Sequence, residues 1–260
     1  MKKFVALLLA VLMVASLCAC GQKGTGSDLQ TVTKGKLIMS TNAEFAPYEY
    51  VADDGKGFQG TGYEGIDIEI AYALAQKLGL ELVVDNMDFD AALSAVQTGK
   101  SDMVAAGVTV TPDRLNAMSF TDSSANGVQV VIVKEGSDIK SIDDLQGKKI
   151  GTQRGTTGFL YCSDDFGDDN VIGFDDGATA VQNLKAGKID CVVIDNVPAQ
   201  EYVKANPGLT ILDTEYANED YAIGIAKDNT ALQEALNKAL AELKADGTIQ
   251  SIIDKYIPAK

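Results

Sequence analysis

The amino-acid sequence predicts an α/β protein made of two similarly built lobes. Strand and helix signals alternate along both halves of the chain, which is the pattern of an α/β fold. A second observation is the similarity between DFDAALSAVQTGKSDMVAAG at 88–107 and DDGATAVQNLKAGKIDCVVID at 175–195. Each segment has a short helix with an apolar stripe, then a Gly-Lys pair, then an apolar run. The two copies lie too far apart for a solenoid repeat of about 20–50 residues, so they indicate two lobes.

Residues 1–19 have the pattern of a lipoprotein signal peptide. Two lysines precede the apolar run FVALLLAVLMVAS, which is too short and wrongly flanked for a membrane-spanning helix. The run ends at LCACG, which resembles a bacterial lipobox. By that resemblance, Cys20 is expected to be diacylated and to become the mature N-terminus. An ordinary secretory signal is the alternative interpretation.

Residues 20–35 are expected to form a flexible tether between this anchor and a globular body. The segment QKGTGSDLQTVTKG is polar and contains glycine, serine and threonine, a composition that favours a flexible chain. We therefore expect an extracytoplasmic protein that is held at the cell membrane by its lipid anchor only.

The composition of the chain excludes several classes of function. The formal charge is −15, and it becomes −17 once the two lysines of the leader are removed. An acidic surface argues against nucleic acid or anionic lipid as partners. The chain has no histidine, which removes histidine-based acid–base catalysis and histidine metal sites. We expect no cofactor and no metal. Cys162 and Cys191 lie in apolar contexts and are interpreted as buried free thiols, with a disulfide between them as the alternative.

The first half of the body is expected to contain three strands and two helices. Apolar runs indicate the strands KLIMST at 36–41, ELVVD at 81–85 and DMVAAG at 102–107. Helices are expected at 65–79 and 90–99. The first helix has acidic residues in its first turn and a glycine at its end. Its apolar stripe consists of Ile70, Ala71, Leu74 and Leu78.

The second half repeats the alternation of strands and helices. Strands are expected at 148–153, 170–174, 190–194 and 209–212, and helices at 156–162, 178–187 and 197–206. In open α/β sheets, ligands usually lie beyond the carboxyl ends of the strands. Loops that follow these strands are therefore the first place to look for a site.

Two extended segments are expected to cross between the lobes. NGVQVVIVK at 126–134 follows the first lobe, and EDYAIGIAKD at 219–228 follows the second. The chain then continues with two amphipathic helices, separated at Gly247, which are expected to return to the first lobe. Two crossings predict a hinge, because paired strands between two lobes can bend.

Several motifs in this order resemble those of a known family, the extracytoplasmic solute-binding proteins of polar amino-acid ABC importers, bacterial family 3. The motifs are TNAEFAPYEY, GIDIEIAYALAQKL, MDFDAALSAVQTGKSDMVAAG, TVTPDRLNAMSFT, QRGTTG, DCVVIDNVPA, DYAIGIAK and KADGTIQSIIDKY. The resemblance implies a two-lobed periplasmic-binding-protein type II fold, with lobe 1 at 36–125 and 221–260 and lobe 2 at 129–217. It also implies a monomer that binds an L-amino acid and delivers it to an ABC transporter permease.

The resemblance places Arg114 where the family holds the α-carboxylate of its ligand. A guanidinium can bind a carboxylate through two parallel hydrogen bonds. Gly107 and Thr109 match neighbouring family residues that contribute a carbonyl and a hydroxyl, and Pro112 is expected to stiffen the turn before the arginine. The alternative is that Arg114 is an ordinary solvated charge beside Asp113.

The second lobe is expected to complete the site with Thr157 and Asp195. The loop QRGTTG follows a strand and opens a helix, where free backbone N–H groups favour an anion. The resemblance assigns Thr157 to the carboxylate and Asp195 to the α-ammonium of the ligand. Each residue has an alternative interpretation as a helix cap. A ligand that bridges Arg114 and Asp195 would favour the closed state of the two lobes.

The ligand's side chain is expected to lie among Phe45, Phe89, Asn42 and Gln153. The resemblance matches the two phenylalanines to aromatic residues that flank the ligand, although burial in the core is the alternative for each. Asn42 replaces an aspartate that is frequent in relatives, and Glu44 is a candidate to restore the negative charge. The sequence therefore predicts a polar L-amino acid and leaves amide, basic and cystine-like side chains open.

Two other functions remain as alternatives to solute binding. The first is an enzyme on the same fold, such as a dehydratase, because fold alone does not settle function. The absence of histidine argues against it, and we expect no enzyme. The second is a ligand-sensing subunit, which is disfavoured because no transmembrane segment follows Lys260.

Overall fold

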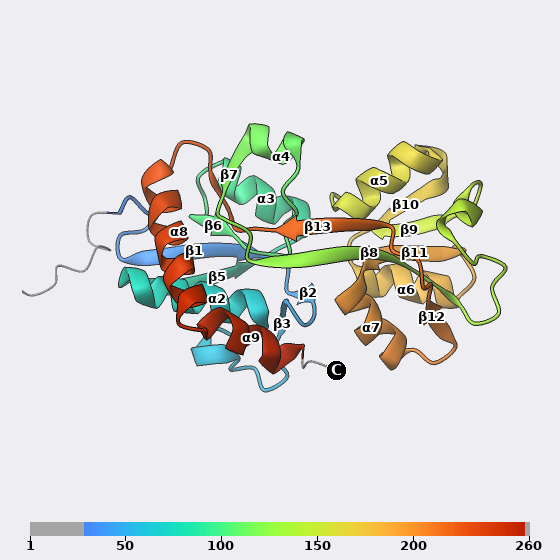
Figure 1. Cartoon of the computed structure of the whole chain (residues 1–260), viewed down its shortest axis with the longest axis horizontal. Coiled ribbons are helices and arrows are strands. Elements are labelled where there is room, and N and C mark those ends of the chain that lie inside the picture. The colour runs from blue at the N-terminus through green and yellow to red at the C-terminus, as the bar shows by residue number, and fades with distance from the viewer. Residues whose placement is uncertain (1–28, 258–260) are drawn as a thin grey trace, which may run out of the picture.

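A computed structural model describes residues 29–257 of the chain. The predicted signal peptide, the lipidation site Cys20 and most of the tether lie outside these residues. Figure 1 shows two lobes side by side, with strands β8 and β13 running between them. Each lobe contains a sheet with helices against it, so the predicted two-lobed α/β fold is confirmed.

The sheet of the first lobe has five strands in the order β5, β1, β6, β14, β7. In chain order these are β1 (Lys36–Thr41), β5 (Glu81–Asn86), β6 (Met103–Val104), β7 (Met118–Phe120) and β14 (Gly224–Ala226). Strand β1 pairs in parallel with β5 and β6, whereas β14 is antiparallel to β6 and β7. The predicted strand at 102–107 is much shorter than expected, because only Met103 and Val104 pair with β1. The chain then leads to Gly107, which has a positive φ of 54°.

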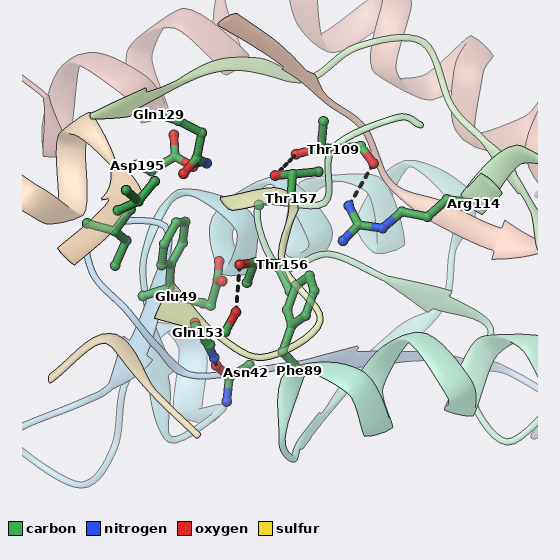
Figure 2. A pocket seen from close by; sticks show the side chains of 15 residues that line it. Asn42, Glu49, Phe89, Thr109, Arg114, Gln129, Gln153, Thr156, Thr157 and Asp195 are labelled. Carbon is green, nitrogen blue, oxygen red and sulfur yellow. Dashed lines mark hydrogen bonds between the residues drawn. The ribbon is translucent and has the colours of Figure 1, made fainter. Parts of the chain in front are cut away.

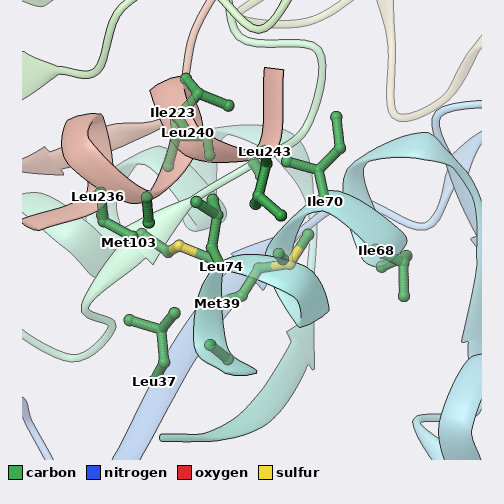
Figure 3. Close-up of a cluster of buried hydrophobic side chains, with 14 of the residues drawn as sticks. Leu37, Met39, Ile68, Ile70, Leu74, Met103, Ile223, Leu236, Leu240 and Leu243 are labelled. Carbon is green, nitrogen blue, oxygen red and sulfur yellow. The ribbon is translucent and has the colours of Figure 1, made fainter. Parts of the chain in front are cut away.

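Four long helices pack against this sheet and form the core of the first lobe. They are α2 (Ile66–Leu78), α3 (Phe89–Gln97), α8 (Thr230–Ala245) and α9 (Thr248–Tyr256). The predicted apolar stripe of α2 is buried, and Leu74 lies among Leu37, Leu236 and Leu240 in Figure 3. The two C-terminal helices pack on α2, as the sequence predicts. The core of the first lobe therefore joins both ends of the described chain.

The sheet of the second lobe has the order β10, β9, β11, β8, β12, and β13 also pairs with β8. Its strands are β8 (Ala125–Lys134), β9 (Ile150–Gln153), β10 (Val171–Phe174), β11 (Cys191–Asp195), β12 (Leu209–Ile211) and β13 (Ala217–Tyr221). The helices are α5 (Thr157–Phe166), α6 (Gly177–Lys185) and α7 (Asn196–Ala205). Within residues 29–257, 3₁₀ turns lie at Phe58–Gly60 in the first lobe and at Ile142–Leu145 and Asp168–Asn170 in the second. Cys162 and Cys191 are both buried and free, and burial raises the pKa of the Cys162 thiol to about 12.

The two crossings lie side by side as an antiparallel pair, in which Ala125 is opposite Tyr221 and Gln129 is opposite Ala217. The second predicted crossing, 219–228, is not one extended segment. Its first part belongs to β13 in the second sheet, and its last part forms β14 in the first sheet. The chain therefore changes sheets just after Tyr221, which is where the two lobes meet.

Strand β7 (Met118–Phe120) was not predicted, and neither were two further elements near the first lobe. One is a small sheet of β2 (Glu44–Phe45), β3 (Glu49–Val51) and β4 (Tyr63–Glu64). The other is helix α4 (Pro112–Ala117), in which the Thr111 hydroxyl accepts a hydrogen bond from the backbone N–H of Arg114. The predicted turn at Pro112 is wrong, because helix α4 begins at this residue. A proline at the first helical position loses no hydrogen bond, and its ring favours the start of a helix. Between residues 29 and 257, no helix is long and apolar enough to cross a membrane.

Candidate functional site

A pocket lies between the two lobes, and residues from both lobes line it (Figure 2). The space between its atoms is about 470 Å³, with the solvent at its opening included. Three strands end at its wall. Strand β1 of the first sheet ends just before Asn42, and the parallel strands β9 and β11 of the second sheet end at Gln153 and Asp195. The lining consists of Asn42, Phe45, Glu49, Phe89, Ala106, Gly107, Thr109, Arg114, Gln129, Gln153, Thr156, Thr157, Val193, Ile194 and Asp195.

All nine residues that the sequence predicts for the site line this one pocket. They come from separate parts of the chain, and the fold brings them together at the interface of the lobes. The sequence did not identify six of the lining residues, namely Glu49, Ala106, Gln129, Thr156, Val193 and Ile194. Among these, Glu49 and Gln129 carry polar side chains that the interior must accommodate.

Arg114 is a buried cation in the wall of the pocket, with 8% of its surface exposed. Its Nη1 donates to the carbonyl of Thr109 at 2.8 Å, and its Nη2 donates to the carbonyl of Gly155 on the other lobe at 3.1 Å. The guanidinium carbon lies 5.5 Å from the centre of the Phe89 ring. Burial lowers the pKa of Arg114, yet an arginine stays charged at any physiological pH. The interpretation as a solvated surface charge is therefore wrong.

Gly107 fits its position for two reasons. Its φ of 54° lies in the left-handed region, and a Cβ atom there would come within 2.8 Å of the Phe45 ring. Its backbone N–H donates to the carboxylate of Asp67 at 3.0 Å. Two residues further on, the hydroxyl of Thr109 lies 3.4 Å from that of Thr157 on the other lobe. Residues 107–109 thus form the part of the first lobe's pocket wall that meets the second lobe.

The threonines at the start of α5 have different roles. Thr156 is the N-cap, and its hydroxyl accepts from the backbone N–H of Phe159 at 3.4 Å. Thr157 is the first helical residue, is 3% exposed and lines the pocket. The helix-cap interpretation therefore applies to Thr156 and is wrong for Thr157. The start of the helix also places backbone N–H groups at this side of the pocket, where they favour an anion.

Asp195 occupies the N-cap position of α7, but its side chain makes no capping hydrogen bond. One carboxylate oxygen accepts from the backbone N–H of Val128 at 3.1 Å, and the other accepts from Nε2 of Gln129 at 2.7 Å. Burial raises the pKa of Asp195 to about 7, although these hydrogen bonds oppose the rise. The capping interpretation of this carboxylate is wrong, and the group instead faces the pocket across from Arg114 (Figure 2).

Asn42 and Gln153 join the lobes at one end of the pocket. Nε2 of Gln153 donates to Oδ1 of Asn42 at 2.9 Å, and the Asn42 amide donates to the carbonyl of Met87 at 3.1 Å. Phe89 is 6% exposed and lies in the core of its lobe while one part of it faces the pocket. Phe45 is partly buried and stacks on Tyr48 at 5.5 Å between ring centres. Core packing and pocket lining thus coexist in both phenylalanines.

Glu49 is the most informative residue that the sequence did not identify. It starts β3, is fully buried, and neither carboxylate oxygen has a hydrogen-bond partner among the described residues. Burial, together with repulsion from Asp67, raises its pKa well above the ordinary value. Glu44, which the sequence suggested as a source of negative charge, is exposed and lies outside this pocket. In the segment PYEY, Glu49 lies between two tyrosines, but this pattern alone does not show in which direction its side chain points.

The raised carboxylate pKa values predict how stability depends on pH. The pKa of Asp67 rises from 3.8 to about 6 and that of Asp195 from 3.8 to about 7. At a pH between the unfolded and the folded pKa of such a group, the folded protein binds more protons than the unfolded chain. The free energy of unfolding therefore decreases as the pH rises through this range. The melting temperature of the wild-type protein is expected to fall between pH 5 and pH 8. In Asp195→Asn we expect this fall to be smaller than in the wild type, by about 3 °C or more. Equal drops in both proteins would contradict this prediction.

The chain is similar to known proteins over most of its length. Residues 37–259 match the family model of bacterial extracellular solute-binding proteins, family 3. The chain is 33% identical to the arginine-binding extracellular protein ArtP of Bacillus subtilis over 98% of each chain, and 33% identical to a probable histidine-binding protein of Neisseria gonorrhoeae over 98% of this chain and 96% of that protein. The solved structure of an ancestral arginine-binding protein bound to glutamine has a TM-score of 0.80 and 39% identity, over 87% of this chain and 100% of that one.

The model match covers most of the chain, and these relatives are similar to it over nearly their whole length. The predicted fold and the predicted family are therefore both confirmed. The chain belongs to the bacterial extracellular solute-binding proteins of family 3.

Proposed function

We propose that this protein binds an L-amino acid with a cationic side chain between its lobes and delivers it to an ABC importer. The observation that carries the proposal is the set of ionisable groups in the pocket lining, which are the Arg114 guanidinium and the buried carboxyl groups of Asp195 and Glu49, whose raised pKa values a cationic ligand would lower. A cationic amino acid has the complementary set of one carboxylate and two positive groups. Because buried charges are costly unless paired, this ligand can pair every charge in the lining.

In this proposal, Arg114 binds the α-carboxylate with help from the hydroxyls of Thr109 and Thr157. The two hydroxyls already meet across the lobes, and the start of α5 adds backbone donors. Asp195 binds the α-ammonium, together with the carbonyl of Gly107. An ammonium beside Asp195 stabilises the charged carboxylate, so binding is expected to lower its pKa and to release a proton near pH 7.

The side chain of the ligand is proposed to extend toward Glu49 between the rings of Phe45 and Phe89. Aromatic faces attract cations, and Glu49 lacks a partner within the described part of the chain. Asn42 and Gln153 offer neutral polar groups at the same end. Similarity to proteins named for arginine and histidine supports a basic ligand, whereas the glutamine-bound ancestral protein makes a neutral polar ligand the competing outcome.

Calorimetric titration with the standard L-amino acids, cystine and ornithine tests the proposal. We expect the tightest binding for a cationic side chain and no chemical conversion of the ligand, because the family consists of solute-binding proteins. Tightest binding of a neutral amino acid would overturn the assignment to Glu49. Conversion of a bound ligand would support the competing enzyme function.

Closure of the lobes is proposed to bury the ligand, with lobe 1 at 36–125 and 221–260 and lobe 2 at 129–217. Each proposed half-site lies on a different lobe, so a bound ligand stabilises the closed arrangement.

We expect the protein to act as a monomer. We also propose that residues 1–19 are removed, that Cys20 carries the lipid and that residues 20–35 form the tether. A Cys20→Ala protein that still partitions with membranes would contradict the lipid anchor.

Gly155→Ala is expected to impair closure. A Cβ atom at Gly155 would come within 1.6 Å of a carboxylate oxygen of Asp90 on the other lobe, so Asp90 would have to turn away. We expect a loss of about 0.5–1.5 kcal/mol in binding free energy and a smaller decrease in radius of gyration when L-arginine is added, measured by X-ray scattering. Gly147→Ala is the matched control, because Gly147 has a φ of 72° against 74° for Gly155 but no atom near its Cβ position. The same loss in both variants would contradict a role in closure.

A further inference from the structure

Glu219 is a buried carboxylate that the proposed site does not use. It lies on β13, one of the two strands that run between the lobes, and only 6% of its surface is exposed. Glu219 does not line the pocket, but it contacts Gln129, which does. On one side it contacts Gln129, which contacts Asp195, and on the other it attracts the charge of Arg114.

Gln129 connects Glu219 to the proposed ammonium site. It lies on β8 directly opposite Asp195 of β11, and its Nε2 donates to Asp195 at 2.7 Å and to Glu219 at 3.0 Å. Both hydrogens of the amide are therefore used, which determines the orientation of the amide. Its oxygen is buried in the pocket lining and has no partner among residues 29–257. The amide oxygen lies near the start of α5, where a Cβ atom at Gly158 would come within 2.8 Å of it, while Nε2 holds the Asp195 carboxylate at the proposed ammonium site.

The groups around Glu219 come from four elements. Arg114 of α4 attracts it, and Asp195 at the end of β11 is repelled by it. Tyr161 of α5 lies beside it, and this proximity and burial raise the pKa of Tyr161 to about 12. Tyr221 follows two residues later on the same face of β13. The Glu219 side chain accepts a hydrogen bond from Gln129, which also donates to Asp195.

We propose that Glu219 is a positioning residue for ligand binding, which accepts a hydrogen bond from the Gln129 amide and so holds that amide against Asp195. This inference rests on the proposed function of the same site. Because Glu219 and Gln129 lie on the two crossing strands, the support of the ammonium site belongs to the hinge. A change in the geometry of the crossing therefore changes the acceptors that the ligand meets.

Two substitutions separate the hydrogen bond of Glu219 from its charge. Glu219→Gln keeps the shape and an acceptor oxygen for Gln129, whereas Glu219→Ala removes the acceptor and leaves the Gln129 amide free to rotate. Asp220→Asn is the matched control, because Asp220 is the next residue on β13 and its side chain is exposed. Melting temperatures of the unliganded variants establish that each one folds.

Binding of L-arginine and of 5-guanidinopentanoate, which lacks the α-amino group, is measured by calorimetry. Glu219→Ala is expected to weaken L-arginine about tenfold, the value of one buried hydrogen bond, and to change the affinity of the analogue less than about twofold. Glu219→Gln is expected to restore most of the L-arginine affinity, and Asp220→Asn to leave it unchanged. Equal losses for both ligands, or no recovery in Glu219→Gln, would show a general structural effect and overturn the inference.

A second measurement needs no ligand. The pKa of the Asp195 carboxyl, followed by carbon NMR, is expected to fall by about one unit in Glu219→Gln, because a neighbouring negative charge is removed. An unchanged Asp195 pKa would overturn the inference even if L-arginine binds. Failure of the wild-type protein to bind L-arginine would instead overturn the proposed ligand class, and the NMR result would still decide the role of Glu219.

Discussion

Replacing Arg114 with alanine is expected to cost about 2–5 kcal/mol of binding free energy, which would abolish measurable binding of most amino acids. The reason is that a ligand carboxylate would enter a closed pocket whose lining contains no other cation. The guanidinium is already oriented, because Thr109 and Gly155 accept two of its N–H groups and Phe89 lies against it. Calorimetric titration with L-arginine at pH 8 measures the loss.

Arg154→Ala is the matched control for this experiment. Arg154 is the only other arginine of the chain; its side chain is 55% exposed and pairs with Asp175 outside the pocket. An exposed ion pair contributes little, about 0–1 kcal/mol, so we expect nearly unchanged binding. If Arg114→Ala bound L-arginine as tightly as the wild type, Arg114 would not be the carboxylate ligand.

Replacing Glu49 with glutamine is expected to remove the preference for a cationic side chain. L-Citrulline has the shape of L-arginine with a neutral end, so the pair isolates the charge. We expect Glu49→Gln to cost L-arginine about 2 kcal/mol or more and to leave L-citrulline nearly unchanged. Titrations at pH 8 are the appropriate measurement, because the pKa of Glu49 is raised and a protonated carboxyl would hide the effect.

Glu44→Gln serves as the control for the Glu49 experiment. Glu44 lies five residues earlier in the same segment, is exposed and does not line the pocket, so its charge is screened by solvent. We expect it to change the ratio of the two affinities very little. Equal losses of L-arginine and L-citrulline in Glu49→Gln would mean that Glu49 supports the fold of the pocket and does not recognise the charge.

The residue types and their order predicted the two-lobed fold, and the resemblance to a known family predicted nine residues of the pocket lining. Thr157 follows the end of β9 and Asp195 ends β11, and these strands are parallel neighbours in the second sheet, whereas Arg114 lies on α4 of the first lobe. Predicting what each side chain does was harder. Adjacent threonines in QRGTTG look equivalent in sequence, but the start of α5 makes Thr156 the cap and turns Thr157 into the pocket.

By itself, the sequence determined the alternation of strands and helices, the apolar stripe of α2, the similarity between the lobes and the family motifs. These features depend on local periodicity and on residues close together in the chain. Only the tertiary structure decided that Glu49 is buried without a hydrogen-bond partner among residues 29–257, that Asp195 binds Gln129 and does not cap α7, and that Glu219 binds the same amide of Gln129. The physical reason is that burial and pairing of charges depend on which distant segments pack together, and local sequence does not encode the direction of a single side chain.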